Sequence, residues 1–257
     1  MKDRMAGANN HRQCDAVFAR VVRQVLWLLV WAAAPAAQAF DFDRLRDASQ
    51  ADFQAIAEDA ANAYQFRQWQ HVRPLSGYWG LGAGVASMSS VQHDDAWSRV
   101  FGQDTTLLGQ IGVAGEMALD SGWSLGAMAS AIPDSGYGVL GASIGWAWPV
   151  SGMSGWEVAA RGAYSSLIGE DDVELDSIGA DLALRRRLGT MTVYGNAGWS
   201  TSRFDVSFGE SSLDAETVNA ARLAVGVSRW FGALFLNGEA GIQSDYVNAT
   251  LSVGFGI

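Results

Sequence analysis

The sequence predicts an all-β fold: an antiparallel transmembrane β-barrel of about ten strands with a short N-terminal periplasmic helix. Three observations lead to this prediction. From Tyr78 onward, bulky apolar residues alternate with glycine, alanine, serine and a few charged residues, which is the period of two expected of strands. An export signal precedes the alternating region. Tryptophans also gather at one end of successive segments, as they do at membrane interfaces.

Residues 1–39 have the features of a secretory signal peptide. Basic residues precede an apolar core at residues 25–34, and Ala37-Gln38-Ala39 forms a small-x-small cleavage site. The apolar core is shorter than the ~20 residues that a membrane-spanning helix needs. We therefore expect cleavage before Phe40 rather than a membrane anchor.

The exported chain is acidic. The whole sequence has a formal net charge of −10, and the signal removes five of the 17 basic residues but only two of the 27 acidic ones. Nucleic acid is therefore excluded as a partner. The only cysteine, Cys14, lies inside the signal, so we expect no disulfide, no cysteine metal site and no cofactor in the exported protein.

Residues 40–75 are predicted to form a periplasmic amphipathic helix. Ser49 and Asp52 resemble a capping pair, and Arg73-Pro74 ends the segment. Three placements stay open: the helix closes the periplasmic mouth of the barrel, enters the lumen as a plug, or docks on another chain. The apolar residues fall on one helical stripe: Phe53, Ile56, Ala57, Ala60, Ala61 and Tyr64.

Residues 76–257 are predicted to form the barrel. Long connections at 89–104, 168–174 and 204–215 fall at one end and short turns at the other, as expected for the outside and the periplasm. Both chain termini then lie on the periplasmic side. The expected strands span 78–88, 105–118, 123–132, 137–149, 155–167, 175–187, 190–203, 216–230, 233–243 and 246–257.

Aromatic residues predict two interfacial belts. The periplasmic belt is expected to contain Trp79, Trp123, Trp146, Trp148, Trp156, Trp230, Phe235 and Phe255. A sparser outer belt is expected to contain Tyr137, Tyr164 and Trp199.

Charged residues set the phase of the alternation. Arg161 on the lipid face near mid-membrane would cost ~2–4 kcal/mol, so the charged face should turn inward. Small residues such as Gly80, Gly82 and Gly84 would share that face. Two interpretations stay open: ion pairs that satisfy one another, or a narrow solute pore, because about ten strands lie between filled and water-filled barrels. The predicted polar cluster of the lumen comprises Glu116, Glu157, Arg161, Asp181, Arg185, Arg222 and Glu239.

No catalytic residue and no metal site is predicted. His93 lies in the first outer loop between Ser89 and Asp95, and on an extended loop adjacent side chains point apart. Motifs of the GxSxG and HExxH types do not occur. An acidic run in another outer loop does not have the spacing of an EF-hand, so a solvated loop is expected. That run contains Glu170, Asp171, Asp172, Glu174 and Asp176.

Several motifs resemble an uncharacterised bacterial family, a domain of unknown function among predicted outer-membrane β-barrel proteins. They are DFQAIAEDAANAY (52–64), RPLSGYWGLGAGV (73–85), ASAIPDSGYGVLGASIGWA (129–147) and AARGAYSSLIGEDDVELDSIGADLAL (159–184). The resemblance implies a fold and a compartment, and it brings no activity or catalytic residue. The chain departs from the common barrel ending, since Ile257 replaces a final aromatic residue.

Taken together, these features predict a monomeric protein of the bacterial outer membrane in the Gram-negative cell envelope, with a structural or surface-binding role and no enzymatic activity. A small porin-like channel is the first alternative, and a lipid- or peptide-modifying barrel enzyme is the second. The expected partners are outer-membrane lipid, lipopolysaccharide and the barrel-insertion machinery.

Overall fold

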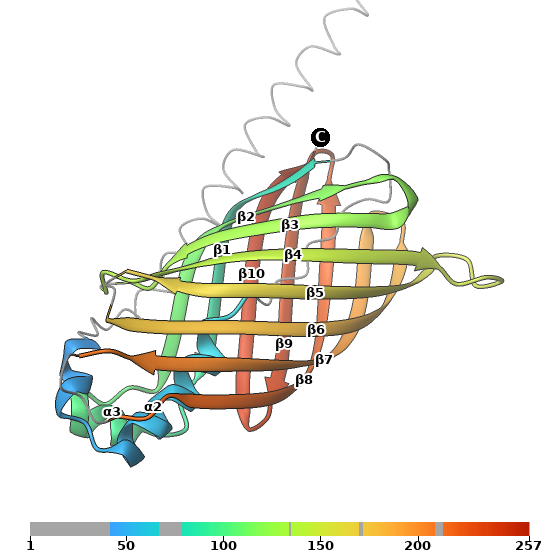
Figure 1. Ribbon diagram of the computed structural model, residues 1–257. Coiled ribbons are helices and arrows are strands. Elements are labelled where there is room, and N and C mark those ends of the chain that lie inside the picture. The colour runs from blue at the N-terminus through green and yellow to red at the C-terminus, as the bar shows by residue number, and fades with distance from the viewer. Residues whose placement is uncertain (1–41, 67–78, 134, 170–171, 209–212, 257) are drawn as a thin grey trace, which may run out of the picture.

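A computed structural model describes residues 42–66, 79–133, 135–169, 172–208 and 213–256. Ten antiparallel strands form one closed barrel, in which β1 pairs with β10 (Figure 1). This confirms the predicted fold class, and the strand borders fall within a few residues of the predicted ones. The predicted signal peptide lies outside the described residues. The strands are β1 (Trp79–Ser90), β2 (Leu107–Ala118), β3 (Trp123–Ala131), β4 (Gly138–Pro149), β5 (Trp156–Ile168), β6 (Val173–Leu188), β7 (Met191–Val206), β8 (Glu216–Phe231), β9 (Leu234–Gln243) and β10 (Tyr246–Gly256).

The alternation of the strands separates an apolar outer wall from a polar interior. On β5, Arg161 is 7 % exposed, whereas Tyr164 on the opposite face is 49 % exposed. Closure of the sheet satisfies the backbone groups that an open sheet would leave at its edges. Large apolar side chains are exposed around the outer wall, among them Ile111, Val113, Leu140, Ile144, Ile178, Leu182, Leu223, Val225 and Ile242. A closed barrel with such a wall is suited to cross a membrane.

A β-bulge in β1 corrects the predicted phase of that strand. The register shifts between Gly82 and Gly84, and one extra residue reverses the faces of all that follow. Gly84 therefore pairs with Val253 on the outer face, and it does not face the lumen as predicted. After the bulge, Val85 and Ser87 are buried inside the barrel.

The prediction of two interfacial aromatic belts is correct in part. Trp123, Trp146 and Phe255 are exposed on the outer wall, and the Trp123 and Trp146 rings lie 6.0 Å apart. Trp230 and Phe235, however, are buried and contact each other inside the barrel. Trp230 follows the inward-facing Arg222 by an even number of residues, so the strand period places both on one face. The prediction had considered the level of Trp230 in the membrane but not its face.

Tyr137 was also predicted in an interfacial belt, and this prediction is wrong. Its side chain is buried, and its ring lies 4.8 Å from the ring of Phe42, edge to face. Tyr164 and Trp199 are exposed on the outer wall, as expected of the outer belt.

The helical segments lie together at one end of the barrel (Figure 1). They are η2 (Phe42–Asp47), α2 (Gln50–Ala63) and α3 (Asp94–Phe101), while the short η3 (Asp120–Gly122) forms a turn between β2 and β3. As predicted, Ser49 caps α2, since its Oγ accepts a hydrogen bond from the backbone N–H of Asp52. No helix in the described residues is long and apolar enough to cross a membrane.

The expected position of α2 at the same end as the short turns is wrong. Helix α2 contacts α3, which follows β1 in the longest connection, and Gln50 bonds to Asp214 and Glu216 at the start of β8. We call this end the long-connection end and the opposite one the short-turn end. The connection from 89 to 104 was expected to be extended, whereas its helix α3 supplies apolar surface for α2 through Trp97.

The main hydrophobic core fills the mouth at the long-connection end. There the inward-facing residues of several strands are apolar, and they pack against the helices. The residues of this core include Phe42, Leu45, Phe53, Ile56, Trp97, Leu108, Val139, Leu167, Leu175 and Phe204. The helical segments therefore form a packed cap, which we define as residues 42–63 together with α3.

Substitution of Leu182 tests which face of β6 meets lipid. Leu182 lies on the outer wall near the middle of β6, and Leu182→Arg should lower the free energy of unfolding by ~2–4 kcal/mol. Reversible denaturant unfolding in phospholipid vesicles measures this loss. Thr217→Arg, on the outer wall near a strand end, should cost only ~0–1 kcal/mol. Equal losses in the two variants would contradict the assignment of the outer wall to lipid.

Candidate functional site

The chain that follows α2 enters the barrel lumen. Phe66 is buried against the wall, where a Cβ atom at Gly141 would lie 2.8 Å from its own Cβ. No side chain fits at such a distance, so glycine at position 141 makes room for Phe66. Gly126 faces the far end of the same ring. We refer to Tyr64, Gln65 and Phe66 as the plug.

Arg161 holds the plug by its backbone and by its ring. Its Nη2 donates a hydrogen bond of 2.6 Å to the carbonyl oxygen of Phe66. Its Cζ also lies 4.9 Å from the centre of the Phe66 ring, a distance at which a cation is attracted to an aromatic face. The backbone N–H of Phe66 donates to Ser165 Oγ at 3.3 Å. Both backbone polar groups of Phe66 are thus bonded to β5.

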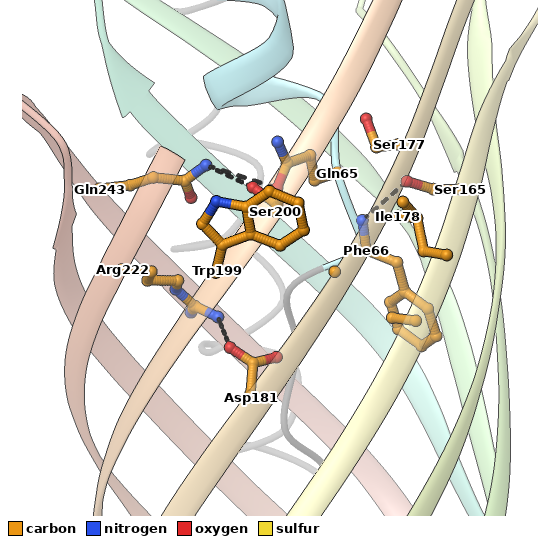
Figure 2. A pocket seen from close by; sticks show the side chains of 12 residues that line it. Gln65, Phe66, Ser165, Ser177, Ile178, Asp181, Trp199, Ser200, Arg222 and Gln243 are labelled. Carbon is orange, nitrogen blue, oxygen red and sulfur yellow. Dashed lines mark hydrogen bonds and ion pairs between the residues drawn. The ribbon is translucent and has the colours of Figure 1, made fainter. Parts of the chain in front are cut away.

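Gln65 connects the plug to other strands. Its Nε2 donates to Ser202 Oγ at 3.1 Å, and its carbonyl oxygen accepts from Gln110 Nε2 at 3.0 Å. Figure 2 shows Gln65 and Phe66 from inside the barrel, with Gln243 bonded to Ser200 nearby. A cavity of about 30 Å³ remains beside the plug, which is room for one or two water molecules.

Four of the seven residues predicted for the lumen form one ionic network beside the plug. Asp181 lies between two arginines: its carboxylate is 4.0 Å from Arg161 Nε and 3.7 Å from Arg222 Nη1. Figure 2 shows the pair of Asp181 and Arg222. Arg222 also bonds to Glu239, which accepts a further hydrogen bond of 3.1 Å from Asn196. Buried charges are tolerated when each has such partners.

Two of the other three predicted residues, Glu116 and Arg185, face the lumen and interact electrostatically with each other. Glu116 also interacts electrostatically with Arg161 of the network. Glu157 lies at the short-turn end and forms an ion pair of 3.0 Å with Arg187. Arg187 was not among the residues predicted for the lumen.

The arrangement favours closure of the lumen. Charges of both signs neutralise one another within the network, so the described residues present no field of a single sign that would select ions. Arg161 belongs both to the network and to the plug contacts. Arg161 therefore connects the plug to the ionic network of the lumen.

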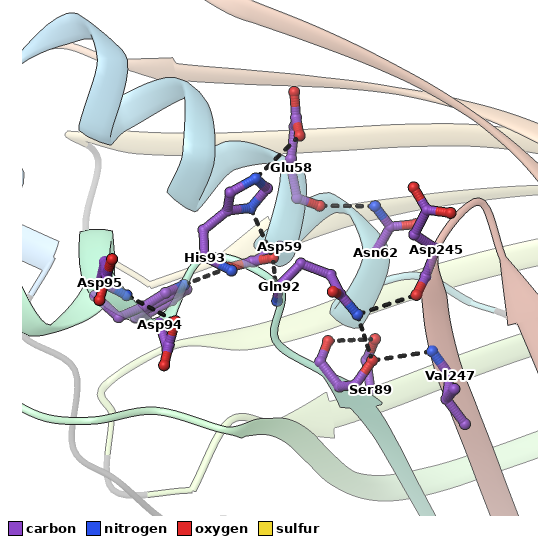
Figure 3. A network of polar contacts seen from close by, with 12 residues as sticks. Glu58, Asp59, Asn62, Ser89, Gln92, His93, Asp94, Asp95, Asp245 and Val247 are labelled. Atoms are coloured by element: carbon purple, nitrogen blue, oxygen red, sulfur yellow. Dashed lines mark hydrogen bonds and ion pairs between the residues drawn. The ribbon is translucent and has the colours of Figure 1, made fainter.

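Asp59 holds the cap in place, although it was not among the residues predicted for a site. Its side chain is fully buried on α2, and it accepts hydrogen bonds from the backbone N–H groups of Gln92 and His93 at 3.1 and 3.3 Å. Trp97 Nε1 donates to it at 2.8 Å. Figure 3 shows Gln92 and His93, from the connection that follows β1, beside Asp59 of α2. A carboxylate with several donors is a strong anchor in a buried setting.

His93 lies between two carboxylates of α2. Its Nδ1 is 3.2 Å from Asp59 Oδ1, and its Nε2 is 3.7 Å from Glu58 Oε2 (Figure 3). The expectation of an extended loop here is corrected, because α3 begins at Asp94. His93 thus helps to hold α2 in place. Within the described residues, no group of three or more His, Cys, Asp and Glu side chains could hold a metal ion; Glu170 and Asp171 lie outside these residues.

An exposed ion pair adds a further contact between α2 and α3. Arg99 Nη2 lies 2.6 Å from Asp52 Oδ1. The hydrogen bond from Arg99, assisted by one from Ser49, lowers the pKa of Asp52. Since the pair is exposed, we expect it to contribute little at ordinary ionic strength.

Comparisons with known proteins bear on the fold alone. No protein-family model and no curated protein matches the sequence, so membership of the family that it resembles stays a prediction. Among similar solved structures, a KdgM porin is 11 % identical with a TM-score of 0.36, covering 69 % of this chain and 98 % of its own. The β domain of the Bordetella autotransporter Brka is 10 % identical with a TM-score of 0.43, covering 70 % and 99 %.

The N-terminal β-barrel domain of Pseudomonas aeruginosa OprF is 14 % identical with a TM-score of 0.33, covering 69 % of this chain and 99 % of its own. The closed antiparallel sheet and its apolar outer wall make the present chain a protein of the bacterial outer-membrane β-barrel type.

Replacement of Asp59 should loosen the cap. Asp59→Asn keeps the size of the side chain but replaces one of the two carboxylate oxygens with an NH2 group. The donors that bond to that oxygen lose their acceptor, and an unsatisfied buried donor costs about 1–3 kcal/mol. Hydrogen exchange of the α2 and α3 amides should therefore become faster, while that of the strands stays unchanged. Asp95→Asn, the same change at an exposed position of α3, is the matched control and should leave exchange near the wild-type rate. Equal rates in all three proteins would argue against Asp59 as an anchor.

Acid should weaken the contact between Asp52 and Arg99. Because the pKa of Asp52 is lowered in the folded protein, its contribution to stability is complete above the unfolded-state pKa of about 3.9 and is lost as the pH falls through the lower folded-state value. Protease cleavage within the cap should be slower in the wild type than in Arg99→Gln at pH 6. This difference should shrink toward pH 3, and a difference that does not depend on pH would contradict the ion pair.

Proposed function

We propose that the protein is an outer-membrane barrel whose own N-terminal segment closes its lumen, and that it has a structural or surface-binding role. The observation that carries the proposal is the position of the plug. Gln65 and Phe66 are bonded to the barrel wall from inside, and the cavity beside them measures only about 30 Å³. Among the described residues, the plug thus occupies the space beside Gly141, Gly126 and Arg161, where a solute would otherwise pass.

The cap supports the surface-binding part of the proposal. Long connections of a barrel are its usual recognition surface, and here they are stiffened by their own hydrophobic core and by Asp59. A stiff surface loses less conformational entropy when it binds a partner. Lipopolysaccharide and outer-membrane lipid are the partners that we propose for the surrounding wall.

A gated narrow pore is the second candidate, and the polarity of the lumen favours it. Several polar atoms within the described barrel are buried and lack a hydrogen-bond partner, including Asn237 Nδ2, Ser228 Oγ and Ser252 Oγ. Such atoms favour the presence of water. Release of Phe66 from Gly141 would then connect hydrated regions of the lumen.

An enzymatic role, the third hypothesis, gains no support from the geometry of the described residues. His93 is engaged by Glu58 and Asp59 of α2 and serves to hold the cap. The lumen network consists of paired charges, and a catalytic acid or base would need one of them in a free and accessible state.

Conductance in planar bilayers tests closure by the plug. Wild-type protein should show no steady conductance. Phe66→Ala removes the ring that lies against Gly141 and Gly126. This variant should show openings, because the space beside the wall is no longer filled.

The two candidate functions predict different conductance traces in planar bilayers. Steady conductance of the wild type would contradict closure by the plug. Occasional wild-type openings that become more frequent in Phe66→Ala would favour the gated pore. Phe231→Ala is the matched control, since it removes an exposed ring from the outer wall and should leave the wild-type behaviour unchanged.

A further inference from the structure

Two exposed arginines stand on the outer wall at the short-turn end, Arg186 on β6 and Arg229 on β8. Each guanidinium lies near an aromatic ring of the same wall. The Cζ of Arg186 is 5.3 Å from the centre of the Trp156 ring, and the Cζ of Arg229 is 5.0 Å from that of Phe231. Aromatic rings and arginines of this kind belong at the membrane interface.

The strand register brings the two arginines close to each other. Arg186 is paired with Val193 on β7, and Arg229 is paired with Met191, which lies two residues from Val193 on the same face. Two strand spacings across and two residues along correspond to about 12 Å between the Cα atoms. The wall between and above the arginines is apolar, and it consists of Leu184, Leu188, Met191, Val193 and Val227.

In the half of the barrel nearest the short-turn end, the described outer wall carries no carboxylate. Neither Arg186 nor Arg229 forms an ion pair with a described residue. The opposite rim differs, since its outward-facing charges are mostly acidic: Glu174, Asp176 and Asp205, with Arg203 paired to Asp205 at 3.1 Å. No described carboxylate at the short-turn rim therefore neutralises these two arginines, so an anion from outside the protein could bind them.

We propose that this surface binds one anionic phospholipid, whose phosphate lies between Arg186 and Arg229 and whose acyl chains lie on the apolar wall. Guanidinium groups match phosphate through their fork of N–H donors. Contact with a ring occupies the face of a guanidinium and leaves its edge available to the phosphate. The site lies outside the lumen, so this inference does not depend on closure by the plug. It rests on the lipid contact proposed for the outer wall and specifies its chemistry.

Lipid binding by the purified, folded protein tests the proposal. Native mass spectrometry with phosphatidylglycerol should show one retained lipid per barrel, in preference to phosphatidylcholine of the same acyl chains. Arg186→Gln and Arg229→Gln should each weaken retention about 5-fold, and the double variant about 30-fold, because each arginine near a membrane surface contributes about equally to attraction of anionic lipid. Glutamine keeps a polar side chain of similar reach.

Arg203→Gln is the matched control, since Arg203 is also exposed on the outer wall but at the acidic rim. It should retain phosphatidylglycerol as the wild type does. A heated and an unheated gel confirms that each variant is a folded barrel. Equal retention by the double variant, equal retention of the two lipids, or saturation of the site by free glycerol phosphate would each overturn the proposal of a phospholipid site.

Discussion

Backbone pairing between β1 and β10 converts an open sheet into a cylinder, and the interior of the protein follows from that closure. Hydrocarbon offers no hydrogen bonds, so an unpaired strand edge there would cost several kcal/mol for each exposed backbone group. Once the sheet is closed, strand alternation directs Arg161, Asp181 and Arg222 into a narrow space. These charges must then find partners among themselves, and Arg161 finds one more in the carbonyl oxygen of Phe66.

The interior changes character along the barrel axis. Its middle layer is ionic, whereas its long-connection end is apolar, with Leu108, Leu175 and Phe204 facing inward. The apolar layer would be exposed to water if the mouth were open. Helix α2 covers it and gains a buried face, which an isolated helix of 14 residues lacks. The same helix leads the plug to Arg161, so hydrophobic coverage of the mouth and closure of the lumen depend on one segment.

The strands could be predicted from the sequence because a period of two is a local signal. The position of α2 was missed, although a signal exists: the inward-facing positions of the strands turn apolar at the long-connection end, as at Leu108 and Phe204. The prediction assigned only small and polar residues to that face along its whole length. Asp59 could not be selected, since its donors Gln92, His93 and Trp97 come from a connection more than 30 residues away in the chain. Contacts of this kind arise from tertiary packing and have no local pattern.

The central claim is that the plug lies inside the barrel, with the ring of Phe66 against Gly141 and Gly126. Nuclear Overhauser contacts in the folded protein, measured in lipid nanodiscs, test this claim most directly. The account predicts contacts from the Phe66 ring protons to the backbone protons of Gly141 and Gly126, and none to lipid chains. Contacts from Phe66 to lipid or bulk water, with none to these glycines, would contradict it.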